Sequence, residues 1–114
     1  MSDCLFCRIV SGEIKPQMVY EDEQIIAIRD INPQAPVHIL IIPRKHIATT
    51  NDLHTEDTAL IGHIVLMATR IAREEAIAEQ GYRTVFNCNS AGCQAVYHLH
   101  LHLLGGRQFG WPPG

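Results

Sequence analysis

The stretch His98-Leu99-His100-Leu101-His102-Leu103-Leu104 alternates histidine with leucine and ends in a second leucine. Residues two apart in an extended chain lie on the same face of a sheet. The three imidazoles are therefore predicted to share one face of a strand, while the leucines pack into a core on the other face. We expect this strand to span residues 96–104 and to end at Gly105-Gly106.

Three interpretations of the histidine face are open from the pattern alone. A solvated face would accept threonine, lysine or glutamate equally well, which disfavours that interpretation. Two histidines at alternate positions can bind one zinc ion. Neutral imidazole, with an ordinary pKa of about 6.5, is also a nucleophile, and neighbouring histidines can donate protons to developing charge. Catalysis on phosphate is favoured by a polar loop just upstream, whose N–H groups suit phosphate oxygens and which contains Asn87, Asn89, Ser90, Gly92 and Gln94.

The rest of the chain predicts an α+β domain around this strand. We expect a long helix from a cap at Thr55 to Glu74, with one apolar face formed by Leu60, Ile61, Ile64, Val65, Ala68, Ile71 and Ala72. A short helix is expected over 5–10, and further strands over 19–21, 24–29, 38–42 and 82–87. Short connections between the strands indicate one antiparallel sheet with the long helix on one face. By length, residues 1–114 form a single domain.

Composition narrows the class of protein. A hydrophobic content of 46% argues against disorder, and a net charge of -3 gives no basic surface for nucleic acid or an anionic membrane. No apolar run approaches the roughly 18 residues of a membrane span, and no secretory signal is visible. We therefore expect a cytoplasmic protein that binds neither nucleic acid nor membranes, with its four cysteines as thiols or metal ligands.

The histidine stretch resembles the histidine triad (HIT) family, in its nucleotide-binding branch. The resemblance extends over Asp30-Ile31-Asn32-Pro33-Gln34-Ala35-Pro36-Val37-His38, Gly105-Gly106-Arg107-Gln108 and Trp111-Pro112-Pro113-Gly114, and so covers nearly the whole chain. It implies a HIT-like fold, a five-stranded antiparallel sheet with one long and one short helix, that dimerises into a continuous ten-stranded sheet. It also implies hydrolysis of the P–N bond of purine nucleoside 5′-phosphoramidates, such as AMP-amines of the AMP-lysine type, with AMP as product, and binding of AMP or GMP.

The resemblance also implies a role for each matching residue, with no cofactor needed for catalysis. His100 matches the nucleophile, which forms a nucleotidyl-histidine intermediate, and the main-chain carbonyl of His98 holds its Nδ1–H. His102 matches a ligand of a non-bridging phosphate oxygen, and His38 completes the cluster. The nucleotide would further contact Asp30 at the ribose, Phe6, Ile9, Ile31 and Leu40 at the base, Asn87, Cys93, Gln94 and Ala95 at the phosphate, and Trp111 across the dimer. Taken alone, without the resemblance, the position of Asp30 ahead of Asn32-Pro33 favours a turn residue.

Two positions depart from the family pattern. Cys93 stands where the family has glycine, and Ala95 where it has serine. Loss of one hydrogen bond to a charged group costs about 1.5 to 3 kcal/mol, or roughly 10- to 100-fold in rate. We therefore expect reduced activity, and a regulatory module that binds AMP with little turnover is the alternative function.

A second group of residues suggests a metal site. The pair Cys4 and Cys7 has the C-x-x-C spacing, which also suits two half-buried thiols or a redox pair. With the segment Pro43-Arg44-Lys45-His46, the resemblance implies a structural zinc bound by Cys4, Cys7, His46 and His98. That assignment weakens a further hypothesis, a metal-dependent hydrolase in which the triad binds zinc.

A few other residues complete the expectations. Cys88 and Cys93 are interpreted as free thiols, and His54 and His63 as exposed residues without a role. Leu66, beside Gly62, is either a dimer contact or a single exposed leucine.

Overall fold

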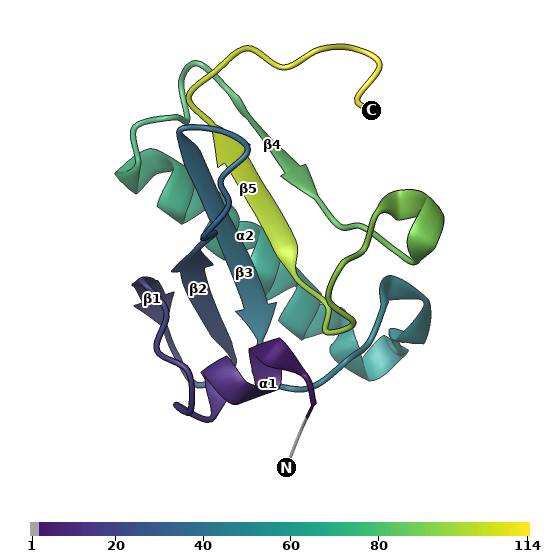
Figure 1. The fold of residues 1–114 in the computed structure, drawn as a ribbon. Helices are drawn as coiled ribbons and strands as arrows, with labels where there is room; N and C mark the ends of the chain where they lie inside the picture. The colour runs from purple at the N-terminus through teal and green to yellow at the C-terminus, as the bar shows by residue number, and fades with distance from the viewer. Residues whose placement is uncertain (1–2) are drawn as a thin grey trace.

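The computed structural model describes residues 3–114 and contains one five-stranded antiparallel sheet in the order β1-β2-β3-β5-β4 (Figure 1). Its elements are α1 (Leu5–Val10), β1 (Met18–Glu21), β2 (Ile25–Arg29), β3 (Val37–Pro43), α2 (Thr58–Glu74), β4 (Tyr82–Val85) and β5 (Leu101–Gly105), with 3-10 turns at Thr50–Asp52, Thr55–Asp57 and Ser90–Gly92. The predicted fold class is confirmed. Neither described α-helix has the length and apolar composition that crossing a membrane requires.

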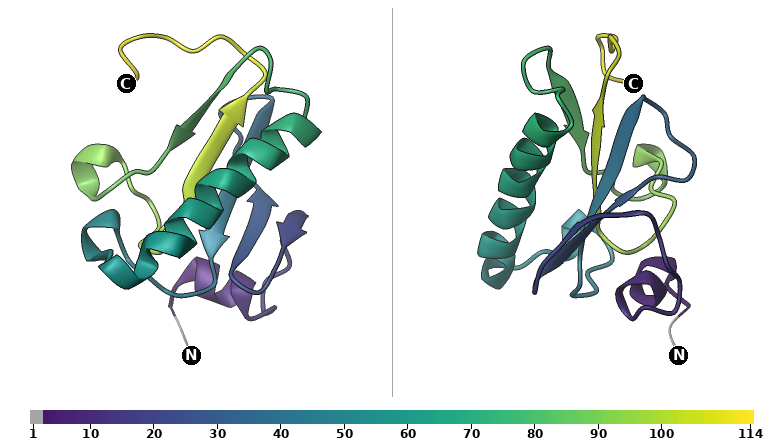
Figure 2. Two further views of the ribbon diagram at one scale, coloured as in Figure 1. Left: turned by 180° about the vertical axis from the view of Figure 1, so that it is seen from behind. Right: turned by 90° about the vertical axis from the view of Figure 1, so that its left-hand side faces the viewer.

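The two helices lie on opposite faces of the sheet (Figure 2). Alternation along the central strands divides the core between them, because successive side chains point to opposite faces. Side chains on the face of α2 include Ile25, Ala27, Ile39 and Ile41. Those on the face of α1 include Ile26, Ile28, Leu40 and Ile42, which pack with Phe6 and Ile9. Each isoleucine, leucine or phenylalanine among them contributes about 1.5 to 3 kcal/mol when fully buried.

The histidine segment divides between the same two faces. Leu99, Leu101 and Leu103 are buried in the core beneath α2, as the alternation predicts. The expected strand boundary is wrong, however, because β5 begins at Leu101 and not at residue 96. The ladder between β3 and β5 ends at Ile41↔Leu101, and the Leu99 N–H donates instead to the Ile47 carbonyl at 2.7 Å. His98 and His100 therefore lie on the segment that leads into the strand.

The fourth strand is also shorter than expected. It ends at Val85, opposite His102, and not at Asn87. In this register residue 86 would face Leu101, the first residue of β5, and residue 87 would face His100, which lies before the strand.

The long helix ends at Glu74, as predicted, and the side chain of Glu75 turns back to Arg29 with N···O distances of 3.0 and 2.9 Å. Its expected start is wrong, since Thr55 begins a 3-10 turn and does not cap the α-helix. That turn is closed by Asp57, whose carboxylate accepts a hydrogen bond from the His54 N–H at 2.9 Å.

The buried face of α2 is rotated slightly from the expected one. Met67 is buried, whereas Val65 is 45% exposed. The apolar stripe that faces the sheet runs through Ile64, Met67, Ala68 and Ile71, at spacings of three and four residues.

Candidate active site and metal centre

A cavity of about 580 Å³ opens on the α1 side of the sheet. Ten of the residues expected in the site line it, namely Phe6, Ile9, Asp30, Ile31, His38, Leu40, Cys93, Ala95, His100 and His102. Apolar side chains from α1, β2 and β3 form one end, and the histidines form the other. The wall does not include Asn87, Gln94 or Trp111, and Trp111 is 85% exposed on the C-terminal tail.

His100 has the orientation of a nucleophile. Its Nδ1 donates a hydrogen bond to the His98 carbonyl at 2.8 Å, so in the neutral ring the lone pair remains on Nε2. The Phe6 ring packs edge-on against it at 4.9 Å between centroids. Burial lowers the pKa of His100, although the His98 carbonyl and Asp30 oppose the shift. The ring is therefore held neutral and able to attack.

His102 has the opposite arrangement of ring nitrogens, and a neighbouring loop sets it. The Gln34 N–H donates to His38 Nδ1 at 3.0 Å, so the proton of neutral His38 lies on Nε2. That Nε2–H faces His102 Nδ1 at 2.9 Å, with Asp30 Oδ2 at 3.4 Å. His102 Nδ1 must then accept, and its Nε2–H is left as a donor. Burial, together with His100 and His38, lowers the pKa of His102 to about 4.

The four expected metal ligands converge beside the catalytic segment. The ligand atoms of Cys4, Cys7, His46 and His98 all lie within 4.8 Å of one another. His98 Nδ1 is 3.4 Å from each sulfur and 3.1 Å from His46 Nδ1, and the Cys7 sulfur is 3.2 Å from His46 Nδ1. Tetrahedral zinc separates such ligand atoms by roughly 3.3 to 3.8 Å.

The tautomer of His98 suits a metal ligand. Its Nε2 donates to the Pro43 carbonyl at 2.7 Å, which directs the Nδ1 lone pair toward the two thiols. The ring is fully buried. These residues therefore fit a zinc ion, which would join the start of α1 and the end of β3 to the histidine segment.

A second cluster, Asp30, His38 and His102, also places three ligand atoms within 4.8 Å. Here the proton positions disfavour a metal. Histidine binds metals through a nitrogen lone pair, whereas the hydrogen bond from Gln34 places a proton on the His38 nitrogen that faces the cluster. The hypothesis that the triad binds a catalytic zinc is therefore not favoured.

The loop before the histidines is held by Gln94. Its buried amide accepts from the Asn89 N–H at 2.9 Å and donates to the carbonyls of Ala48 and Val96 at 2.8 and 3.0 Å. Gln94 therefore shapes the loop and does not reach into the cavity. Asn87 packs beside the Gly92 backbone in the same loop. Cys93 is exposed at the cavity wall with φ 63° and ψ 34°, a left-handed conformation that favours glycine.

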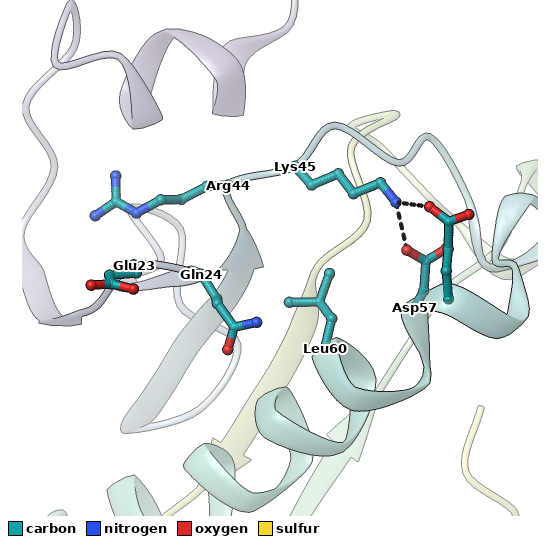
Figure 3. A pocket seen from close by; sticks show the side chains of 7 residues that line it. Glu23, Gln24, Arg44, Lys45, Asp57 and Leu60 are labelled. Atoms are coloured by element: carbon teal, nitrogen blue, oxygen red, sulfur yellow. Dashed lines mark hydrogen bonds and ion pairs between the residues drawn. The ribbon is translucent and has the colours of Figure 1, made fainter.

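A smaller groove of about 300 Å³ lies between the end of β3 and the start of α2 (Figure 3). Lys45 reaches across to Asp57 at 2.6 Å and Glu56 at 3.3 Å, and these hydrogen bonds raise the pKa of Lys45. Arg44 extends the other way, to Glu21 at 3.0 Å. The two cations thus anchor the segment that carries His46.

Several participants were missed by sequence reasoning. Nine further residues line the cavity, namely Leu5, Ile14, Lys15, Pro16, Ile28, Arg29, Asn32, Gln34 and Val96. Ile28 could have been found, because it alternates with Ile26 and pairs with Leu40. Nothing in the sequence signals the main-chain donor of Gln34. His63 was also misjudged, since it is half-buried and its Nε2 lies 2.7 Å from Asp22 Oδ2, whereas His54 is exposed as expected.

Known proteins resemble the chain over nearly its full length. The family model described as "Scavenger mRNA decapping enzyme C-term binding" matches residues 3–109. The purine nucleoside phosphoramidase of Escherichia coli strain K12 is 48% identical over 108 residues, which are 95% of this chain and 91% of that protein. A 14 kDa zinc-binding protein of Zea mays is 48% identical over 118 residues, covering 99% and 89%. The crystal structure of a HIT family hydrolase from Legionella pneumophila Philadelphia 1 superposes with a TM-score of 0.96 at 58% identity, covering 98% and 100%.

Proposed function

The chain belongs to the histidine triad family, and we propose that it hydrolyses the P–N bond of purine nucleoside 5′-phosphoramidates through a nucleotidyl intermediate on His100. The observation that carries the proposal is the hydrogen bond from His100 Nδ1 to the His98 carbonyl, which leaves a nucleophilic Nε2 in a nucleotide-sized cavity. The phosphoramidase relative from Escherichia coli supports the same substrate class.

In the first step, the base occupies the apolar end of the cavity and Asp30 accepts from the ribose hydroxyls. The Nε2 lone pair of His100 attacks the α-phosphorus and forms a new P–N bond. The bond to the leaving nitrogen breaks, and the amine departs with that electron pair and takes a proton from solvent. His102 Nε2–H donates to a non-bridging oxygen, where negative charge is concentrated.

In the second step, water attacks the phosphorus of the intermediate. The bond to His100 breaks, its electron pair returns to Nε2, and the nucleoside monophosphate leaves with the oxygen of water. Dividing one displacement into two is the advantage of covalent catalysis. The zinc that the Cys4 cluster fits has a structural task in this scheme, since it would bind the ring of His98, whose carbonyl orients His100.

The alternative is a module that binds AMP with little turnover. Ala95 and Cys93 favour it, because both lie in the cavity wall where the family pattern has serine and glycine. The main-chain N–H groups of the loop remain, so we expect weaker catalysis and not its loss.

We further propose that the protein is a homodimer. Leu66 is 69% exposed on the outer face of α2, beside the half-exposed Val65. Strand β4 lies at the edge of the sheet, where a second copy can continue the ladder. Such a dimer would give the ten-stranded sheet and bring Trp111 of the second copy toward the leaving group.

One experiment separates these functions. Amine release from an adenosine 5′-phosphoramidate is measured with excess chelator in the parent, in His100→Ala and in the exposed control His54→Ala. Removing the nucleophile is expected to lower turnover by at least about 10³-fold, with His54→Ala unchanged. AMP binding without turnover in the parent would support the module instead. Turnover that chelator abolishes while the fold persists would indicate metal chemistry.

A further inference from the structure

The C-terminal tail contacts the loop that controls His38. Arg107 Nε donates a hydrogen bond to the Gln34 carbonyl at 3.0 Å. The N–H of the same Gln34 donates to His38 Nδ1 at 3.0 Å, and His38 Nε2 lies 2.9 Å from His102 Nδ1. Arg107 is thus the outer end of a chain of hydrogen bonds that reaches the cavity.

The tail holds Arg107 in this position. Its guanidinium carbon lies 4.3 Å from the centroid of the Phe109 ring, and its Nη1 donates to the Gln108 carbonyl at 3.2 Å. The preceding Gly106 has φ +91°, and a β-carbon there would lie 2.9 Å from Pro36 Cβ. The turn at Gly106 therefore packs directly on the loop that contains Gln34.

That loop belongs to no helix or strand and depends on a few hydrogen bonds. Its two ends are joined where the Asp30 N–H donates to the His38 carbonyl at 3.0 Å. Among the residues that the structure describes, the Gln34 side chain donates a hydrogen bond only to the Asn32 carbonyl, at 3.1 Å. Arg107 supplies an anchor within the loop, at Gln34, on the peptide group adjacent to the one that donates to His38.

We infer that Arg107 is a positioning residue that, through the Gln34 main chain, fixes the protonated nitrogen of His102. The effect of Arg107 on catalysis rests on the proposed function. With the Gln34 donor in place, His38 carries Nε2–H and His102 presents Nε2–H to the phosphate. If the loop shifts and His38 carries Nδ1–H instead, His102 must donate from Nδ1. Its Nε2 lone pair then faces a phosphate oxygen, and a hydrogen bond becomes a repulsion.

The first test is ¹⁵N NMR of the imidazoles in the full chain without substrate. The parent is expected to show His102 protonated at Nε2. Arg107→Gln is expected to shift a measurable fraction of His102 toward the Nδ1–H form, and Arg107→Lys, which keeps a cationic donor, to restore part of the parent signal. Gln34→Ala keeps both main-chain groups and should give the parent spectrum.

Arg83 provides a matched control. It also stacks on Phe109, at 5.1 Å, and donates to the Gly110 carbonyl at 2.8 Å, but it makes no described bond to Gln34. Arg83→Gln should therefore leave the His102 spectrum unchanged. An equal change of the His102 spectrum in both arginine variants would assign the effect to anchoring of the tail in general and would overturn the inference. An Arg107→Gln variant with the parent's His102 spectrum would overturn it as well.

The second test is steady-state phosphoramidate hydrolysis. Arg107→Gln is expected to lower kcat by roughly 3- to 10-fold, because only His102 rings that keep Nε2–H can donate to the phosphate, with KM little changed. Thermal unfolding of each variant shows whether it is folded. A kcat equal to the parent's would contradict the inference. Because the spectra need no substrate, an inactive parent with the expected spectral change would count against the proposed function alone.

Discussion

His98 binds its neighbour His100 through the main chain while its own ring belongs to the metal cluster. The His98 carbonyl accepts from His100 Nδ1 at 2.8 Å, and His98 Nδ1 lies 3.4 Å from the sulfur of Cys4. One residue therefore links the position of the nucleophile to the site that would hold zinc. A disturbance at the thiols is expected to reach the reaction through this residue, although neither cysteine lines the cavity.

Loss of zinc is expected to destabilise the protein. Protein purified without chelator should contain one zinc per chain, and Cys7→Ser should lose it, with the free energy of unfolding falling by about 4 kcal/mol or more, as is typical when a metal site is lost. Elemental analysis and thermal unfolding measure both effects. Cys88→Ser, outside the cluster, is the control. Parent protein without zinc, or Cys7→Ser with the parent's zinc content, would rule out the site.

Cys93→Gly is expected to stabilise the loop. Cys93 has φ 63°, and a left-handed conformation costs a residue with a β-carbon roughly 1 kcal/mol. Chemical denaturation should show a gain of about that size, reduced by the greater freedom of glycine in the unfolded chain. Ser90→Gly, in the same loop but without positive φ, should instead lose stability. A loss of stability in both variants would contradict the backbone strain at Cys93.

Ala95→Ser is expected to raise turnover. A hydroxyl at this point of the cavity wall can donate to the phosphate or the leaving group. If the bond forms mainly in the transition state, kcat should increase by roughly 10- to 100-fold. Ala91→Ser, exposed in the same loop and outside the wall, serves as the control. Equal rates in parent and Ala95→Ser would show that the serine hydroxyl has no such role here.

His102 is expected to stay neutral until the solution is distinctly acidic. Burial and the neighbouring His100 lower its pKa to about 4. An NMR titration should place the midpoint of its ring protons there, in contrast to about 6.5 for an unperturbed histidine. The unfolded chain takes up this proton first, so acidification from pH 6.5 toward 4 should lower the free energy of unfolding. A midpoint near 6.5 would contradict the effect of desolvation and of the neighbouring His100 on this pKa.

Leu66→Glu is expected to disrupt the dimer. A carboxylate buried without a partner is costly, so the dissociation constant should rise by roughly a hundredfold or more. Light scattering after size-exclusion chromatography measures the mass. Met18→Glu, at a residue 39% exposed on the opposite edge strand, is the control and should leave the mass unchanged. A parent that is monomeric at all concentrations would overturn the dimer itself.

Much of the fold follows from local patterns. Strict alternation in the histidine segment predicts which side chains face the core, and the spacing of apolar residues predicts the long helix and its end at Glu74. Strand ends were less predictable. Leu101 begins β5 because the ladder with β3 stops there, although β3 itself continues to Pro43, and the chain before Leu101 bonds instead to Ile47.

The residues of the site were likewise predictable only in part. His100, His102, His38 and Asp30 were identified in advance and do line one cavity. Asn87 and Gln94 were predicted to contact the phosphate, but neither lines the cavity, and the Gln94 side chain turns inward to hold the loop. A sequence indicates that a polar side chain is near the site, whereas the competing carbonyls that capture it are known only once the chain is folded.

The sequence alone determined the chemistry that is available, since alternation places three imidazoles on one face and two thiols lie within one turn of helix. Only the tertiary structure decided what each imidazole does. His98 donates from Nε2 to Pro43 and so presents Nδ1 to the thiols, whereas His38 receives the Gln34 N–H on Nδ1 and so donates from Nε2. Identical side chains acquire different roles because the proton of a neutral imidazole goes to the nitrogen that faces an acceptor. For His98 that acceptor is Pro43, 55 residues away along the chain, and for His38 it is His102, 64 residues away.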